Sequence, residues 1–579
     1  MLKYWFSRRL RADARAGAQW QRLSAFAFAG VLASAAAAHA DTTSSQDAAQ
    51  KSAAPAPASK ATAPKPNQQP VQHFDIDEYR VTGADLLPQI EVEEAVYPFL
   101  GPNRSAEDVE KARAALEKAY VSKGYQTVSV SIPQQNVRNH VVLLHVVEGK
   151  VGRLRVNNAR YFDTDKIKGR APSLAEGKVP NFNAVTQDIF ALNQWADRKV
   201  TPALRAGVKP GTVDVDLNVE DKLPLHGSVE VNNRQSPNTT MLRVNGTIHY
   251  DNLWQRGDSL SFTYQVAPER VSDAEVFSAS YLARTGIDWL NVLVYGVDSN
   301  SNVATVGGLD VVGPGQIIGA RGVLTLPSRE NFFETLSLGL DYKHFGESVG
   351  LATQGGFSTP VTYVPLVAAY SATWLGEGRQ TAFNATVTAN IRGIGSTTAE
   401  FDNKRYLATG GFVTLRSDIS HTQELPGGLQ LYGKIQGQLA DQPLVSSEQF
   451  SGGGFDTVRG YLESETLGDI AGAGTIELRS PNIPDWVRAT FKDEDGQPVS
   501  FTGLNSWRLF AFVDGASLLT LKALPETPSH YDLASYGFGT TFKLLDHANG
   551  MVAVAMPLIS QAYTTAGDPR VLFRVWGEF

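Results

Sequence analysis

The feature that most constrains the fold is an alternation of apolar and polar residues that runs from residue 224 to the C-terminus. It comes in segments of about ten residues, separated by Gly, Asn, Asp, Ser and Pro. In the segment 335–343 every second residue is apolar, namely Leu336, Leu338, Leu340 and Tyr342. A side-chain period of two belongs to a β-strand. This part of the chain is therefore predicted to be all β, without helices.

Two architectures alternate in this way: a β-sandwich around an apolar core, and a barrel that turns its apolar face to lipid. Long segments, wide glycine-rich loops and the aromatic C-terminal residue Phe579 favour the transmembrane barrel. No run of about 18 apolar residues follows the N-terminal region, which excludes a helical membrane protein. A sheet in lipid has to close on itself, because each unpaired backbone group costs roughly several kcal/mol in hydrocarbon.

The alternating segments number about sixteen. They lie near 225–235, 241–254, 257–268, 274–286, 288–299, 316–327, 331–345, 360–375, 379–393, 404–418, 427–440, 470–482, 505–516, 531–545, 549–559 and 569–579. An even number is needed if soluble modules precede the first strand and the C-terminus returns to their side of the membrane. We therefore predict a barrel of about 16 antiparallel strands over residues 223–579.

The N-terminal region predicts export. Basic residues precede an alanine-rich apolar stretch, 23–40, which ends in the small-x-small sequence Ala38-His39-Ala40. Residues 1–40 are thus predicted to be a signal peptide, with an N-terminal membrane anchor as the alternative. Residues 41–72 have almost no large apolar side chain, and we expect a disordered linker.

Between the linker and the barrel, the pattern predicts two tandem copies of one small α/β module, at 73–149 and 150–222. In the first, strands are expected at 74–83, 127–133 and 140–149, and helices at 87–101 and 105–123. Ser105 and Asp108 form a capping box at the start of the second helix. In the second module, strands are expected at 151–162, 202–208 and 212–221, and a helix at 181–200.

Composition and motifs argue against several classes of function. The formal net charge of -7 does not indicate a basic surface for nucleic-acid binding. The absence of cysteine excludes disulfides and thiolate chemistry. No nucleotide-binding G-x-x-x-x-G-K-[ST] run occurs. None of the histidines lies in a recognisable serine or carboxylate constellation, and neither H-E-x-x-H nor an EF-hand run is present. We therefore expect no enzyme, no cofactor and no metal site.

One loop stands out, "GGGFDTVRGYLESETLGD", residues 452–469, between the eleventh and twelfth predicted strands. Its glycines lead to a single arginine, Arg459. A loop of this length can fold back into the barrel, where the arginine is hydrated or paired. Strand parity places two carboxylates on the lumen face: Asp514, together with Phe512, and Glu477. The sequence leaves open which of them pairs with Arg459.

These motifs resemble a known superfamily. Val458, Arg459, Gly460 and Tyr461 are similar to the sixth-loop motif of BamA-type outer-membrane proteins. Phe512 to Asp514 resembles part of the thirteenth-strand motif F-x-D-x-G, although Gly515 follows the aspartate directly, and Phe579 fits the C-terminal barrel signature. Two modules before a barrel resemble the paired POTRA domains of two-partner secretion transporters (the TpsB, haemolysin activator family). The resemblance covers roughly 73–579.

The resemblance implies secretion. An unfolded exoprotein, TpsA-like and of the haemolysin or adhesin class, would pass from the periplasm through the barrel to the surface of a Gram-negative bacterium. Outer-membrane lipid, periplasmic chaperones and the barrel-assembly machinery would be further partners. An assembly insertase of the BamA type is the alternative function, and a diffusion porin would need no modules. Some relatives carry a helix that plugs the barrel, but residues 41–72 are too rich in Pro, Ala and Ser to predict one.

The first module offers a candidate client-binding edge beside helix 105–123. An exposed strand can add an extended client through backbone hydrogen bonds. We predict this role for a strand edge made of Thr127, Val128, Ser129, Val130, Ser131 and Ile132. The alternative is that the modules only pack against each other.

Overall fold

The computed structural model describes residues 73–137, 139–287, 289–301, 303–306, 309–327, 329–346, 348–351, 354–492 and 503–579. The predicted signal peptide and linker lie outside these residues, as does any plug helix in 41–72. The described chain divides into two compact units, one ending at Leu223 and the other starting at Pro224. Within the described part, no helix is both long and apolar enough to cross a membrane.

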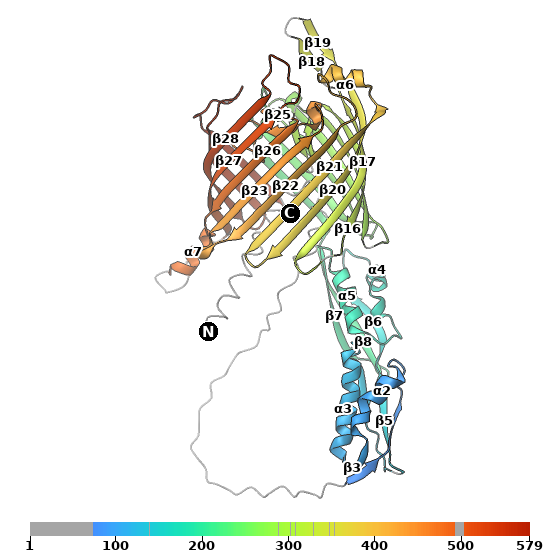
Figure 1. Cartoon of the computed structure of the whole chain (residues 1–579). Coiled ribbons are helices and arrows are strands. Elements are labelled where there is room, and N and C mark those ends of the chain that lie inside the picture. Colours follow the sequence, from blue (N-terminus) through green and yellow to red (C-terminus); the bar gives the residue numbers. More distant parts are fainter. Residues whose placement is uncertain are drawn as a thin grey trace. The chain divides into compact units, whose positions relative to one another are not determined.

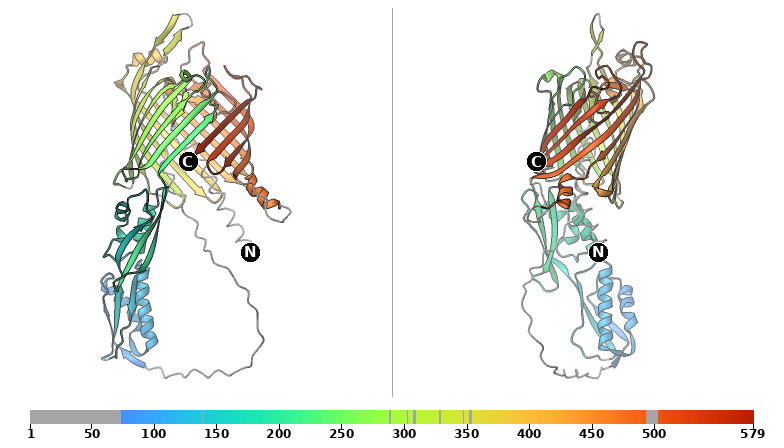
Figure 2. Two further views of the ribbon diagram at one scale, coloured as in Figure 1. Left: turned by 180° about the vertical axis from the view of Figure 1, so that it is seen from behind. Right: turned by 90° about the vertical axis from the view of Figure 1, so that its left-hand side faces the viewer.

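The second unit is a closed antiparallel barrel of sixteen strands (Figures 1 and 2). In order of pairing these are β9 (Leu225–Asn232), β10 (Arg243–Leu253), β11 (Asp258–Val266), β12 (Ala274–Arg284), β13 (Leu290–Ser301), β16 (Gly315–Thr325), β17 (Phe332–Phe345), β20 (Val361–Gly376), β21 (Arg379–Gly395), β22 (Val413–Glu424), β23 (Gln430–Ala440), β26 (Ile470–Arg479), β27 (Leu504–Leu519), β28 (His530–Leu544), β29 (Ala548–Pro557) and β30 (Arg570–Glu578). The last strand pairs with the first, from Arg574 opposite Asn232 to Glu578 opposite Ser228. The predicted barrel is confirmed.

The alternation places apolar side chains outside and polar side chains inside, as expected for a membrane barrel. On β17, Leu338 and Leu340 are each 47% exposed on the outer surface, whereas Ser337 and Asp341 are buried inside. A sandwich would bury the leucines and expose the polar residues. The outer wall is thus apolar and the lumen polar, as lipid outside and a hydrated interior require.

The prediction that no helix follows residue 224 is wrong in two loops. α6 (Thr398–Lys404) and α7 (Ile483–Thr490) each form a short helix between barrel strands. Thr397 and Glu400 form a reciprocal capping box at the start of α6. Such local hydrogen bonds can start a helix too short to show a 3.6-residue period. Small hairpins also extend the loops: β14 (Val303–Val306) with β15 (Leu309–Val312), and β18 (Ser348–Leu351) with β19 (Gln354–Ser358).

The first unit begins with a small α/β module. Its sheet has the order β2 (Glu78–Thr82), β5 (Val141–Glu148) and β4 (Val128–Ser131), covered by α2 (Gln89–Val96) and α3 (Ala106–Ser122). The Ser105–Asp108 capping box is present at the start of α3. The single strand predicted over 74–83 is two strands, because β1 (His73–Ile76) pairs instead with β3 (Gly101–Ser105). Leu116, Tyr120 and Leu144 are fully buried in its core.

The second module repeats the plan with a sheet of order β6 (Lys150–Asn157), β8 (Thr212–Asp221) and β7 (Arg198–Ala206). Two helices accompany it, α4 (Thr164–Gly169) and α5 (Phe182–Leu192). The helix predicted over 181–200 ends early. Asn193 makes two hydrogen bonds to the backbone of Val200, at 2.6 and 3.0 Å, which turn the chain into β7. Tertiary pairing here overrides a continuing helical pattern.

Candidate functional site

The candidate site is built on the arginine loop, residues 452–469. Its base is a short hairpin in which β24 (Phe450–Gly452) pairs with β25 (Thr466–Gly468). Gly460 follows the arginine with φ +100°, a conformation that side-chain-bearing residues rarely adopt. A Cβ there would also lie 3.4 to 3.5 Å from atoms of Ala555, Pro557 and Ser535. Glycine therefore lets the loop turn sharply against β28 and β29.

Arg459 reaches from the loop to Asp514 on β27. Its Nε and Nη2 donate to the two carboxylate oxygens at 2.8 and 2.9 Å, and its backbone N–H donates to the same carboxylate at 3.0 Å. A planar guanidinium matches a carboxylate in this two-bond geometry. Asp514 thus fixes both the side chain and the backbone of the loop at Arg459.

Glu477 on β26 is a second partner of Arg459. Its Oε2 accepts from Nη1 at 2.7 Å, while its Oε1 accepts from Nε of Arg479, also at 2.7 Å. The two carboxylates that parity placed on the lumen face are therefore both used. Two arginines and two carboxylates alternate in one chain of charge-assisted hydrogen bonds, which leaves no buried charge without a counter-charge within this cluster.

Phe512 lies under the arginine. The guanidinium carbon is 3.5 Å from the centre of the Phe512 ring, within the range of a cation–π contact. Room for the ring comes from Gly537 on β28, where a Cβ would lie 2.5 Å from the ring and 2.2 Å from the Val554 carbonyl oxygen. The displaced motif glycine does not disturb the strand, because Gly515 pairs in register with Gly474 of β26 and Ala534 of β28.

The arginine site is buried rather than hydrated. Arg459 is 8% exposed and Asp514 2%. Burial by itself lowers the pKa of Arg459, but the hydrogen bonds and charges of Asp514 and Glu477 outweigh it, and the net pKa is raised. The arginine therefore stays charged at any physiological pH. A desolvated fork of this kind is stronger than the surface pair of about 0–1 kcal/mol that would form in bulk water.

The rest of the motif anchors the loop to the wall. Val458 is fully buried with Leu518 and Leu533. The hydroxyl of Tyr461 lies 2.7 Å from the carbonyl oxygen of Ile559 and accepts from the backbone N–H of the same residue at 3.2 Å. All four motif residues thus contact the interior of the barrel. Val458 packs against apolar side chains and Gly460 forms a tight turn, while Arg459 and Tyr461 make polar contacts.

A second ion cluster holds the loop near its tip, and sequence reasoning did not find it. Arg234, which follows β9, donates from Nε to Glu463 at 3.0 Å and also contacts Asp456. The backbone N–H of Glu463 donates to the carbonyl oxygen of Gln235 at 3.0 Å. Strand parity cannot locate partners in loops, so no signal in the sequence pointed to this contact. The arginine loop is therefore tied both to the wall and to the loop between β9 and β10.

Contrary to expectation, four histidines in the described part of the chain do meet carboxylates. His140 lies 2.8 Å from Asp77, His226 and His249 lie 4.0 and 3.3 Å from Asp251, and His530 lies 3.0 Å from Asp532. His530 also lies 3.4 Å from the hydroxyl of Ser517, but both contacts use the same ring nitrogen, Nε2. A triad needs the two nitrogens of the ring on different partners. The Ser517, His530 and Asp532 side chains therefore do not form a catalytic relay in this geometry.

The predicted client edge is an edge strand in the structure. β4 pairs with β5 on one side only. The carbonyl of Val130 accepts from Nη1 of Arg113 on α3 at 3.3 Å. Ser129 and Ser131 are exposed, whereas Val128 and Val130 turn their side chains into the core. Backbone groups of β4 are thus accessible beside α3.

Two family models match the chain. Residues 74–149 match the POTRA domain, ShlB-type, and residues 367–490 match the haemolysin secretion/activation protein ShlB/FhaC/HecB model. The outer membrane transporter CdiB of Dickeya dadantii is 23% identical over 68% of this chain and 70% of its own length. The heme/hemopexin transporter protein HuxB of Haemophilus influenzae is 21% identical over 63% of this chain and 64% of its own length.

Solved structures agree on the fold. CdiB from Escherichia coli is 19% identical with a TM-score of 0.57, over 90% of this chain and 93% of that one. BamA from Haemophilus ducreyi, lacking POTRA domains 1–3, is 13% identical with a TM-score of 0.53, over 87% of this chain and 100% of that one. At these identities the likeness concerns the fold alone.

A sixteen-stranded barrel preceded by α/β modules, with an arginine loop bound to its inner wall, defines a POTRA-barrel protein of the outer membrane. Its modules lie in the periplasm. The ShlB-type matches in both parts of the chain and the similarity to CdiB support a transporter that secretes an exoprotein, of the two-partner secretion, haemolysin activator type.

Proposed function

We propose that the periplasmic modules bind the partner exoprotein in an unfolded state, and that the arginine loop shapes and closes the lumen until this client enters. The partner is an exoprotein of the TpsA-like, haemolysin or adhesin class. The single observation that carries the role of the loop is the buried contact of Arg459 with Asp514 and Glu477 on the inner wall. A loop bound there occupies space that a translocating chain would need.

The bonds of the loop suit a part that moves as a unit. Polar and ionic contacts hold it at Arg459, at Tyr461 and at Glu463. Water or polar groups of an entering client can replace such contacts, while displacement would also expose the apolar contact of Val458 with Leu518 and Leu533. The loop can thus be displaced without unpairing any barrel strand.

Client capture is assigned to the edge of β4, from Thr127 to Ile132. Two features support it: the unpaired edge, and the neighbouring helix α3, whose Arg113 contacts the strand. Backbone pairing recognises an extended chain with little dependence on its sequence. Arg113 already occupies the carbonyl of Val130, so a client strand would displace this side chain.

The test is secretion of the cognate exoprotein by cells that carry Arg459→Ala, together with single-channel conductance of the purified barrel in planar bilayers. We expect altered conductance and reduced secretion, because a freed loop leaves the lumen unclosed and the client path unshaped. If both measurements match the wild type, the loop does not perform this role.

The insertase alternative shares the barrel fold, as the likeness to BamA shows. Depletion of the chain separates the two functions. A dedicated transporter predicts the loss of one secreted or surface protein, while an insertase predicts a general loss of outer-membrane barrels. Outer-membrane lipid, periplasmic chaperones and the barrel-assembly machinery complete the proposed partners, since a barrel has to be delivered and inserted before it can transport.

A further inference from the structure

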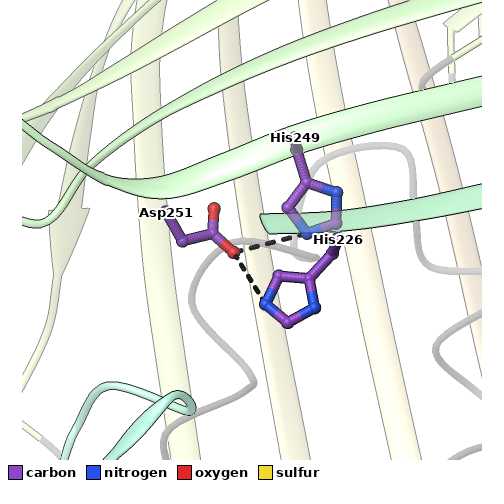
Figure 3. Close-up of side chains that lie close together, drawn as sticks. All are labelled: His226, His249 and Asp251. Atoms are coloured by element: carbon purple, nitrogen blue, oxygen red, sulfur yellow. Dashed lines mark ion pairs between the residues drawn. The ribbon is translucent and has the colours of Figure 1, made fainter. Parts of the chain in front are cut away.

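We propose that the lumen face of the first barrel hairpin holds a divalent transition-metal ion of the zinc class, bound by His226, His249 and Asp251 (Figure 3). His226 comes from β9, and the other two residues come from β10. This site lies outside the arginine loop and its contacts. It does not depend on the proposed route of the client.

Strand register brings the three side chains together. His226 and His249 are directly opposite each other in the β9–β10 pairing, and Asp251 is two residues further along β10 on the same face. Parity places this face inside the barrel, because Ile248, which precedes His249 on β10, and Val229 on β9 have the opposite parity and are 48% and 58% exposed on the outer wall. The backbone N–H of Asp251 donates to the carbonyl oxygen of Pro224 at 2.9 Å, which extends the pairing to the edge of the site.

The donor atoms are close enough to share one ion. Oδ2 of Asp251 lies 3.3 Å from Nε2 of His249 and 4.0 Å from Nε2 of His226, and one ligand atom from each residue lies within 4.8 Å of the others. Ligands about 2.0–2.2 Å from a tetrahedral ion are separated by little more than 3 Å. Small rotations of the two imidazole rings, which are stacked with centroids 5.0 Å apart, would complete the convergence. Figure 3 shows the Asp251 carboxylate directed at both rings.

A hydrogen bond to its second carboxylate oxygen also orients Asp251. Its other oxygen, Oδ1, accepts a hydrogen bond from the hydroxyl of Ser259 on β11. A second partner of this kind fixes a ligating carboxylate and leaves the remaining oxygen for the ion. The site is thus supported by three neighbouring strands, which hold ligands more precisely than loops do.

The ligand types select the class of ion. Two imidazoles and one carboxylate are donors that zinc and its neighbours accept, whereas calcium and magnesium prefer oxygen alone. Each of the three side chains is about a third exposed, at 31%, 31% and 36%, so water can reach a fourth coordination position. The ion would link β9 to β10 near the start of the barrel. β9 is also the strand that pairs with β30 to close the barrel.

The test measures Zn²⁺ binding to the full-length protein, purified in detergent without a polyhistidine tag. Titration against a chromophoric chelator gives the stoichiometry and affinity, and Co²⁺ in place of Zn²⁺ reports a tetrahedral site by its visible absorption. Heat-dependent migration in SDS gels verifies that each variant is a folded barrel. We expect one Zn²⁺ per chain, with affinity at least about tenfold lower in His249→Ala and Asp251→Asn, and lower by a similar factor in Ser259→Ala.

His421→Ala is the matched control, because His421 lies on β22, outside the proposed site, and its Nδ1 is 2.8 Å from the hydroxyl of Thr381. It should bind Zn²⁺ as the wild type does. The proposal is overturned if the folded wild-type protein binds no stoichiometric Zn²⁺, or if His249→Ala, Asp251→Asn and Ser259→Ala bind it as tightly as His421→Ala.

Discussion

Arg459 donates two parallel hydrogen bonds to Asp514, at 2.8 and 2.9 Å, and Asp514 also accepts from the backbone N–H of Arg459 at 3.0 Å. One carboxylate on β27 therefore determines where the arginine side chain points and where the loop backbone runs. The second carboxylate, Glu477, is shared with Arg479 and links the same arginine to the neighbouring strand. The position of the loop thus depends on a small number of buried bonds.

The first prediction concerns Arg459→Ala. It leaves two buried carboxylates without this cation, a change that costs about 3–5 kcal/mol in comparable buried pairs. We expect the loop to detach from the wall, and limited proteolysis to cleave within 452–469 where the wild type resists. Arg459→Lys should be intermediate, since an ammonium keeps the charge but cannot form the two-bond fork.

Arg321→Ala is the control for a lost buried arginine. Arg321 donates to Asp341 at 2.9 Å inside the barrel wall, in a cluster with Tyr295. This variant should lower thermal stability while the loop stays protected. Equal cleavage of the loop in both arginine variants would show that general destabilisation, and not the Arg459 fork, exposes it.

The second prediction concerns the space under Phe512. In Gly537→Ala the new Cβ would lie 2.5 Å from the Phe512 ring and 2.2 Å from a carbonyl oxygen, so the ring has to move from beneath Arg459. Overpacking of this kind costs about 1–3 kcal/mol. We expect a lower unfolding temperature and partial exposure of the arginine loop to protease. Gly472→Ala, on β26, meets nothing within 4 Å and should change neither measurement.

Much of the barrel could be predicted because the environment of its side chains alternates regularly along each strand. Lipid on one side and water on the other force a period of two, which gave the number of strands and assigned the faces of β27. The tenth segment, predicted at 404–418, was placed too early, because α6 and a loop precede β22 (Val413–Glu424). The same parity placed Asp514 and Glu477 in the lumen, and the structure brings both to Arg459. Choosing between the two carboxylates from sequence was impossible, because a guanidinium with five N–H groups can bind both.

Contacts that depend on strand register or on the path of a loop could not be predicted from the sequence pattern. Arg234 meets Glu463 across 229 positions of sequence, and nothing periodic connects them. His226 and His249 become neighbours only when the offset between β9 and β10 is known. A shift of one residue would turn one of the two rings to the lipid face. The short helices α6 and α7 escaped detection for a related reason, since less than three turns carry too little period to read.

The third prediction tests the client edge. The carbonyl of Val130 accepts from Arg113 of α3, and in an antiparallel pair the N–H and C=O of one residue point to the same side, so we expect the N–H of Val130 on the free side of β4. Val130→Pro removes this donor and leaves the pairing of Ser129 and Ser131 with β5 in place. We expect residues 73–223 carrying Val130→Pro to retain less of the N-terminal segment of the exoprotein in a pull-down. Val130→Ala, which loses similar packing but keeps the N–H, should retain it. Equal retention by the two variants would rule out strand addition at this edge.

The fourth prediction concerns the pH dependence of the first module. The backbone N–H and the hydroxyl of Ser105 hold the pKa of Asp108 below its usual value of 3.8. The folded state therefore favours the ionised carboxylate. The stability that follows is fully present above the unfolded pKa and is lost as the pH falls through the folded one.

We expect urea unfolding of residues 73–223 to show this loss below about pH 4, where a free aspartate is about half protonated. Asp108→Asn should flatten the dependence, and Ser105→Ala should cost about 1 kcal/mol at neutral pH, the usual contribution of a helix N-cap. Glu107→Gln is the matched control, because it alters the neighbouring carboxylate in the first turn of α3 without touching the capping box. A pH profile that Asp108→Asn leaves unchanged would assign the acid sensitivity of the module to other carboxylates.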